Sequence, residues 1–227
     1  MRRARQAGFG ANAALLFPLV TGSGSFPAII PLSLLEAMRN LDTPVEDGLD
    51  DLAEELVTKR LGLSSTVAAQ IERYRRAAQR EERIPGDEVV AVFRLVSRRA
   101  DADLVYADAG RRTARYAARG VPALRRFLVR LAPKGLRRRL GVASAARVAG
   151  RLLNATLRPH GELARVEMRE SLATRAAAAG QGCRFYGAAF AELLRVLSGF
   201  EGAMVHEGCQ ARGDSTCRWS ASPAEGY

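Results

Sequence analysis

Residues 183–219 read CRFYGAAFAELLRVLSGFEGAMVHEGCQARGDSTCRW and hold all three cysteines of the chain, together with one of its two histidines. Thiolates and imidazoles bind zinc, and a structural zinc site takes four such ligands in a tetrahedron. The first part of the segment has the apolar spacing of a helix, and the second part reads as a hairpin. The segment therefore predicts a metal site that joins a helix to two paired strands, with Cys183, His206, Cys209 and Cys217 as its ligands.

The fourth ligand of this site depends on the geometry of the strand that carries it. In a regular strand, positions three apart point to opposite faces of the sheet, which would separate His206 from Cys209. Gly208 can relieve this conflict, because a glycine permits a bulge at this point. Glu207 is the competing oxygen ligand if His206 points away from the cysteines.

Two alternatives for the three cysteines involve no zinc. They can simply be small buried apolar residues, and an iron–sulfur cluster usually needs four of them. Zinc is therefore the metal we expect. We expect it in a structural role, since four protein ligands leave no coordination position for water. Without His206, water or Glu207 would complete the shell.

The remaining sequence predicts an α+β protein. Alternating apolar residues predict strands at 152–158 and 164–168, after a long helical part, so the order is helices followed by an antiparallel sheet packed with helices. We expect a helical region over residues 1–100, which either packs on the rest or dimerises, and a second domain over residues 101–222. The helices expected before the sheet, from apolar spacing, cover 44–62, 64–82, 88–98, 106–119, 124–131 and 136–151.

Basic residues are concentrated in the middle of the chain. No Asp or Glu occurs between Asp108 and Glu162, whereas fourteen Arg or Lys residues do, more than the net charge of +11 on the whole chain. Such a region suits an anionic partner: lipid headgroups, an acidic protein, a carboxylated ligand or nucleic acid. The alternative is an ordinary solvated helix surface. Nucleic acid is the weakest candidate, because the region lacks a recognised binding motif and interleaved aromatic residues.

The odd number of cysteines favours a reducing compartment over a secreted disulfide framework. An apolar run over residues 11–20 follows Arg2, Arg3 and Arg5 and mimics a signal peptide, but it is too short to span a bilayer. We therefore expect a cytoplasmic protein without a transmembrane helix, with peripheral attachment to the inner membrane as an alternative.

The segment from Cys183 to Trp219 resembles the 4-vinyl reductase domain. This small α+β domain is related in fold to the vesicle-tethering Bet3-type subunits and also serves as the ligand-sensing domain of aromatic-responsive transcription regulators. Those sensors hold zinc with three cysteines and a carboxylate, and His206 stands here at the position of the carboxylate. The resemblance thus implies zinc bound by the three cysteines and His206, and it makes residues 101–222 a ligand-binding domain.

The upstream string DAGRRTARYAARG, residues 108–120, narrows the resemblance to the bacteriochlorophyll biosynthesis protein J family. The likeness covers residues 104–150 and 183–221, whereas residues 40–100 have no recognised counterpart. Where the family has an aromatic segment after its third helix, this chain has only ARVAGRLLN, residues 146–154. Ligand contacts in that segment therefore do not carry over.

The resemblance implies a tetrapyrrole-binding accessory or carrier protein of bacteriochlorophyll biosynthesis and photosynthesis. It would bind a Mg-porphyrin and act with a pathway enzyme or photosynthetic complex, as a monomer or a homodimer. One alternative is a small-molecule-sensing or assembly subunit that uses the same domain. The other is a genuine 8-vinyl reductase, which needs a source of electrons. The string GFGANA at residues 8–13 is a poor dinucleotide fingerprint, because too few residues precede it for a strand. We therefore expect binding rather than catalysis and predict no catalytic residue.

Overall fold

The computed structural model describes residues 24–43, 61–122, 131–160, 163–176 and 180–224. The helices predicted over 44–62 and 124–131 fall almost entirely outside these residues. The N-terminal apolar run and the glycine string at 8–13 also lie outside them.

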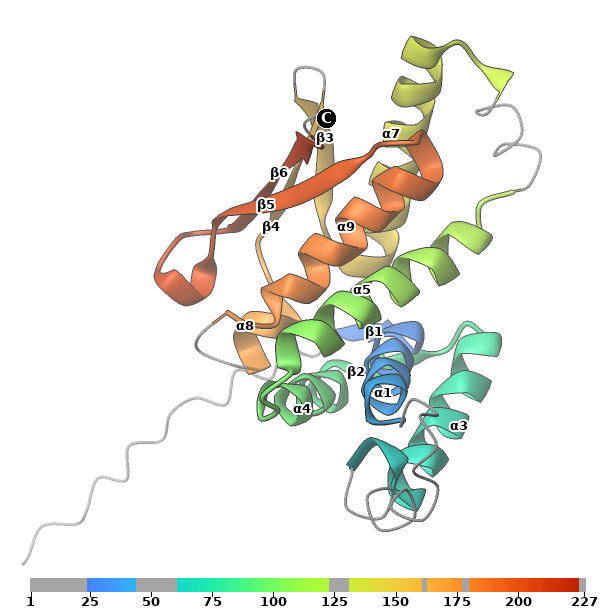
Figure 1. The fold of residues 1–227 in the computed structure, drawn as a ribbon, viewed down its shortest axis with the longest axis vertical. Coiled ribbons are helices and arrows are strands. Elements are labelled where there is room, and N and C mark those ends of the chain that lie inside the picture. Colours follow the sequence, from blue (N-terminus) through green and yellow to red (C-terminus); the bar gives the residue numbers. More distant parts are fainter. Residues whose placement is uncertain (1–23, 44–60, 123–130, 161–162, 177–179, 225–227) are drawn as a thin grey trace, which may run out of the picture.

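The first part of the described chain is helical, with one small sheet (Figure 1). Strand β1 (Ser25–Pro27) pairs antiparallel with β2 (Arg83–Pro85). Ser64 caps the second long helix, because its hydroxyl accepts a hydrogen bond of 3.3 Å from the Val67 N–H. The helical elements of this part are α1 (Ile29–Asp42), the short η1 (Leu61–Leu63), α3 (Ser65–Gln79), α4 (Gly86–Ser97) and α5 (Ala102–Arg119).

The second part contains the main sheet, and the α+β class expected from the sequence is confirmed. Its four strands are antiparallel in the order β3-β4-β6-β5, so the last strand lies inside the sheet. The elements are α7 (Lys134–Leu153), β3 (Thr156–His160), β4 (Leu163–Met168), α8 (Leu172–Ala176), α9 (Cys183–Ser198), β5 (Gly202–Gly208), η2 (Gln210–Arg212) and β6 (Cys217–Pro223).

Several helix boundaries differ from the sequence-based expectation. Helix α5, for example, begins at Ala102 rather than at residue 106. Helix α7 continues to Leu153 and ends at Asn154, whose φ of 53° is left-handed. Asparagine tolerates this conformation at a helix end, so the strand expected from residue 152 begins only at Thr156. Helix α1 contains Pro31 in its first turn, where proline is tolerated.

One hydrophobic core extends through both parts of the chain, from Ala28 to Ala221. The helical region within the first hundred residues therefore packs on the rest of the chain. Six aromatic side chains form a continuous series of ring contacts through this core, from α4 and α5 across α9 to β6. These residues are Phe93, Tyr106, Phe185, Tyr186, Phe190 and Trp219.

Helix α9 is flanked by α5 and α7 at very short range. A Cβ atom added to Gly110 of α5 would lie 2.2 Å from the Phe185 carbonyl oxygen, and one added to Gly141 of α7 would lie 2.4 Å from that of Leu197. Glycine is thus required at both crossings, because any larger residue would push the two backbones apart.

We expect Gly110→Ala to destabilise the protein by about 2–3 kcal/mol, since the added methyl group meets backbone rather than a movable side chain. Urea unfolding followed by circular dichroism measures this change. The matched control is Gly135→Ala on α7, where an added Cβ meets nothing within 4 Å. That substitution should stabilise by about 0.5–1 kcal/mol through helix propensity alone. Equal effects of the two substitutions would contradict the close crossing.

A buried carboxylate also links α9 to α5. Glu192 is 5% exposed and accepts hydrogen bonds of 2.7 Å from Arg115 and 2.7–2.8 Å from Arg195. The hydrogen bonds from Arg195, supported by Arg115, lower the pKa of Glu192 from 4.5 to about 2. The ion pair therefore holds the middle of α9 against α5.

This ion pair predicts a loss of stability in acid. Because the pKa of Glu192 is lower in the folded state, its ionised carboxylate stabilises the fold fully above about pH 4.5. This contribution to the free energy of unfolding disappears as the pH falls to about 2. We expect Glu192→Gln to cost on the order of 2 kcal/mol at pH 7, because both arginines are half exposed and screened by water. The difference from wild type should shrink at pH 3, measured by urea unfolding. Glu170→Gln, at an exposed position, is the control and should change little at either pH.

Candidate metal centre

The four predicted ligands come together at one end of α9. Cys183 is the first residue of α9, His206 lies in β5, Cys209 follows β5 directly and Cys217 opens β6. One potential ligand atom from each of the four lies within 4.8 Å of the others. All three cysteines are buried. The group therefore draws together a helix and both strands of the terminal hairpin.

A bulge in β5 makes this arrangement possible. His206 pairs with Trp219 and Gly208 with Arg218, so Glu207 is an extra residue without a partner on β6. The irregularity lies at Gly208, where the sequence predicted it, and allows His206 and Cys209 to reach the same group. The Glu207 carboxylate lies 3.9 Å from the Arg165 guanidinium and is 40% exposed. The structure thus gathers His206, and not Glu207, with the cysteines.

The donor set and its spacing fit a metal such as zinc. The Sγ atoms of Cys183 and Cys209 are 3.8 Å apart, too far for a disulfide, whose S–S bond is about 2.0 Å. Two thiolates on a tetrahedral zinc, each about 2.3 Å from the metal, stand about 3.8 Å apart. The observed separation is therefore compatible with both thiolates binding one zinc ion.

The imidazole of His206 is held in place, with its Nε2 atom left without a hydrogen bond among the described residues. Its Nε2 atom is buried and is one of few buried side-chain atoms, within the described residues, that make no hydrogen bond. The ring stacks on Trp219, with centroids 4.7 Å apart and planes 12° apart. A buried imidazole nitrogen without a partner loses free energy unless something binds it, and a metal ion would satisfy it.

Backbone groups around the cluster orient the sulfur atoms. The Gln210 N–H lies 3.4 Å from the Sγ of Cys217 and donates to it. The Asp214 carboxylate accepts a 2.6 Å hydrogen bond from the Cys209 N–H and fixes the turn after β5. Sequence reasoning did not identify either contact, because both depend on how the η2 turn folds.

The thiols differ in acidity. A hydrogen bond from Cys183 lowers the pKa of Cys217, and the Gln210 N–H and His206 act in the same direction. The pKa of Cys183 is raised, because that thiol donates to Cys217 and is buried. The pair therefore favours one thiolate that accepts a hydrogen bond from its neighbour, and a divalent cation would favour ionisation of the other thiols as well.

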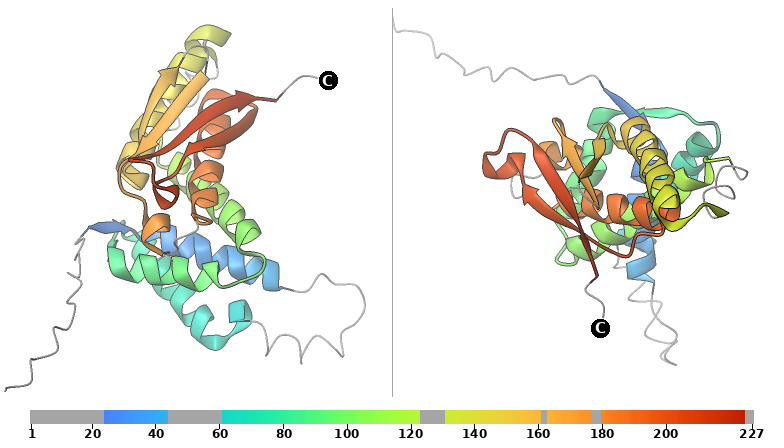
Figure 2. Two further views of the ribbon diagram at one scale, coloured as in Figure 1. Left: turned by 90° about the vertical axis from the view of Figure 1, so that its left-hand side faces the viewer. Right: turned by 90° about the horizontal axis from the view of Figure 1, so that it is seen from above.

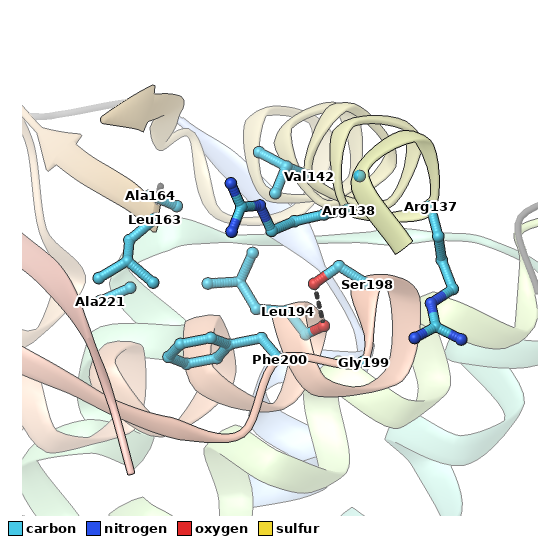
Figure 3. A pocket seen from close by; sticks show the side chains of 11 residues that line it. Arg137, Arg138, Val142, Leu163, Ala164, Leu194, Ser198, Gly199, Phe200 and Ala221 are labelled. Atoms are coloured by element: carbon cyan, nitrogen blue, oxygen red, sulfur yellow. Dashed lines mark hydrogen bonds between the residues drawn. The ribbon is translucent and has the colours of Figure 1, made fainter. Parts of the chain in front are cut away.

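Two hollows lie elsewhere in the structure, and none of the four clustered residues lines either. The smaller one, about 340 Å³, lies between α7, the end of α9 and the sheet. Figure 3 shows Arg138 above its apolar floor near Val142 and Leu194, and Arg137 lines the hollow from the first turn of α7. The hydroxyl of Ser198 at its rim donates a hydrogen bond of 2.6 Å to the Leu194 carbonyl oxygen, so this donor is already used within α9.

The larger hollow is a groove of about 740 Å³, formed by the start of α1, the end of α3, the end of α5 and the middle of α7. Arg147 and Arg151 of α7 line one side of it, and Glu81 and Glu82 line another. The sequence indicated a basic region here but not which arginines face a hollow. Their spacing of four residues, which places them on one face of α7, is the only signal that the sequence contains.

No family model, curated protein or solved structure gives a significant match to this chain.

The cluster predicts which residues bind metal. We expect the purified protein to contain one zinc ion per chain, measured by elemental analysis. His206→Ala should weaken zinc binding at least about 100-fold, because a buried ligand is lost. Glu207→Ala, one residue away, is the matched control and should leave the metal content unchanged. Loss of zinc in Glu207→Ala but not in His206→Ala would overturn the ligand assignment.

Removal of the metal should also be visible in fluorescence. Trp219 is the only tryptophan, is 1% exposed and stacks on His206. We expect a chelator to shift its emission to longer wavelength and to lower the melting temperature, and added zinc to reverse both changes. Without any chelator, Cys217→Ser should already show the long-wavelength Trp219 emission that chelation produces in wild type. It should also lower the free energy of unfolding by about 3 kcal/mol or more. Unchanged emission on removal of a full equivalent of zinc would contradict this coupling.

Proposed function

We propose that the chain is a zinc-stabilised binding protein for an amphipathic ligand with carboxylate groups. The groove between α1, α3, α5 and α7 is the observation that carries this proposal. From the resemblance of the cysteine segment and of residues 108–120, we further propose a Mg-tetrapyrrole of bacteriochlorophyll synthesis as the ligand. The protein would act as an accessory or carrier that delivers the tetrapyrrole to a pathway enzyme.

The groove suits a ligand of this size and polarity. Its volume of about 740 Å³ lies within the range of roughly 300–1,000 Å³ that is usual for small-molecule sites. Its apolar lining comes from the four helices and would contact the faces of a tetrapyrrole. The apolar side chains are those of Ile29, Leu32, Ala78, Tyr116, Ala117, Val121, Val148 and Leu152.

Two arginines of the groove are well placed for carboxylates. Arg147 and Arg151 lie one turn apart on α7, and among the described residues neither pairs with an acidic side chain. Arg147 donates only to the Ala143 carbonyl oxygen of its own helix, at 3.2 Å. A guanidinium group binds a carboxylate through two parallel hydrogen bonds, so each could hold one propionate.

The other charged residues of the groove orient such a ligand. Arg75 is paired with Glu36 at 3.0 Å, and Arg83 binds the Ser25 hydroxyl at 3.0 Å, so both are already engaged. Glu81 and Glu82 would repel a carboxylate from their side. The propionates are therefore expected against α7, with the ring system towards α1 and α5.

Zinc would have a structural role in this protein. Its proposed ligands belong to α9, β5 and β6 and do not line the groove. The metal would hold the terminal hairpin on α9, and α9 supports α5 and α7, which form two sides of the groove. Removal of zinc should thus weaken ligand binding through stability rather than through a lost contact.

The proposal predicts that the protein binds Mg-protoporphyrin IX. We expect micromolar affinity, detected by a shift of the Soret absorbance and by quenching of porphyrin fluorescence. Arg147→Gln combined with Arg151→Gln should weaken binding by about tenfold or more, because both charge-assisted contacts are lost. Arg98→Gln, an exposed arginine that does not line the groove, is the control and should bind like wild type.

The dimethyl ester of the porphyrin separates the carboxylate contacts from apolar binding. Wild type should bind the free acid more tightly than the ester, and the double variant should bind the two equally. Absence of any spectral change at micromolar porphyrin would refute the tetrapyrrole. Tight binding of an unrelated aromatic carboxylate in the same groove would favour a small-molecule sensor instead.

A further inference from the structure

We propose that the N-terminal end of α7 docks the protein onto a membrane surface that carries anionic lipid headgroups. The docking surface, which we call the α7 tip, consists of four residues in the first two turns of α7 and one leucine just before the helix. These residues are Leu136, Arg137, Arg139, Leu140 and Leu131. This inference is independent of the groove and of its ligand.

The apolar side chains of the α7 tip are exposed without a packing role. Leu131 is 67% exposed, Leu136 50% and Leu140 37%. Leu136 and Leu140 lie four residues apart and so share one face of α7. The face that packs on the protein carries other residues, namely the buried Val142, Ala145 and Ala149. The leucines therefore do not contribute to the core, and three of them lie within ten residues of the chain.

The arginines beside these leucines give the tip a strong positive charge. Arg137 and Arg139 lie in the same two turns, and the sequence contains no acidic residue between Asp108 and Glu162. A helix end that combines exposed leucines with arginines has the composition of a membrane-surface segment. Leucines can enter the boundary between headgroups and acyl chains, while guanidinium groups bind the lipid phosphates.

The position of the tip would let it reach a flat surface. The first turns of α7 extend past the strands of the sheet at one end of the molecule (Figures 1 and 2). Within the described residues, no helix is both long and apolar enough to cross a membrane. The protein would thus attach peripherally to the membrane surface, through the α7 tip.

A lipid surface accounts for the tip better than a protein or nucleic-acid partner does. A second copy of the chain would bring two positive tips together, which electrostatic repulsion disfavours. Nucleic acid would bind the arginines but would gain little from exposed leucines, since its phosphate backbone dominates affinity. The combination of both residue types therefore points to anionic lipid.

Vesicle flotation tests this proposal. The full-length protein should float with vesicles of phosphatidylcholine mixed with phosphatidylglycerol, and not with phosphatidylcholine alone. Leu136→Ala combined with Leu140→Ala should weaken binding by about tenfold, because the inserted apolar surface is lost. Arg137→Gln combined with Arg139→Gln should weaken it by about tenfold or more and reduce its salt dependence. The control is Leu104→Ala, which removes a leucine of α5 that is 62% exposed and should leave binding unchanged.

The opposite results overturn the proposal. Equal binding to both kinds of vesicle, or no binding to either, would exclude recognition of anionic lipid. Flotation that is insensitive to the two leucine substitutions would show that the tip is not the contact. Binding to duplex DNA that tolerates the leucine variant, combined with absence of vesicle binding, would assign the arginines to nucleic acid. Circular dichroism confirms that each variant is folded, since all substituted side chains lie outside the core.

Discussion

The rest of the structure depends on the close contact that the backbone of α9 makes with two other helices. Gly110 and Gly141 allow α5 and α7 to lie directly against it, one on each side. With its axis fixed in this way, α9 presents Cys183 at its first residue and Glu192 in its middle. The candidate metal ligand, the buried ion pair and the aromatic core are thus all positioned by one helix.

Residue chemistry and spacing predicted which four residues come together at the candidate metal centre. Helix α9, the terminal hairpin and the four clustered residues follow from local patterns, because three cysteines and a histidine within 35 residues leave few other arrangements. Even the bulge was predictable, since His206 and Cys209 cannot otherwise meet and Gly208 is the residue that allows it. The competition between His206 and Glu207 needed the structure, because it depends on which side chain faces Arg165.

The parts that the sequence did not predict depend on contacts between distant residues. Strands β1 and β2 are three residues each and pair across more than fifty intervening positions, so neither has a local signal. The groove is formed by four helices, and the exposure of Arg147 to it follows only from their packing. The same limit applies to the α7 tip. Leu136 and Leu140 look like core residues in the sequence, and only the packing of α7 shows that they face outward.

The position of β6 has a consequence for how the chain is made. This strand comes after every other described element, yet it lies inside the sheet between β4 and β5. During synthesis β4 and β5 must wait for their common neighbour, and Cys183 must wait for Cys217. The sheet and the four-residue cluster would therefore be completed together, once β6 has been synthesised. Until then the exposed edges of β4 and β5 are open to pairing with other chains.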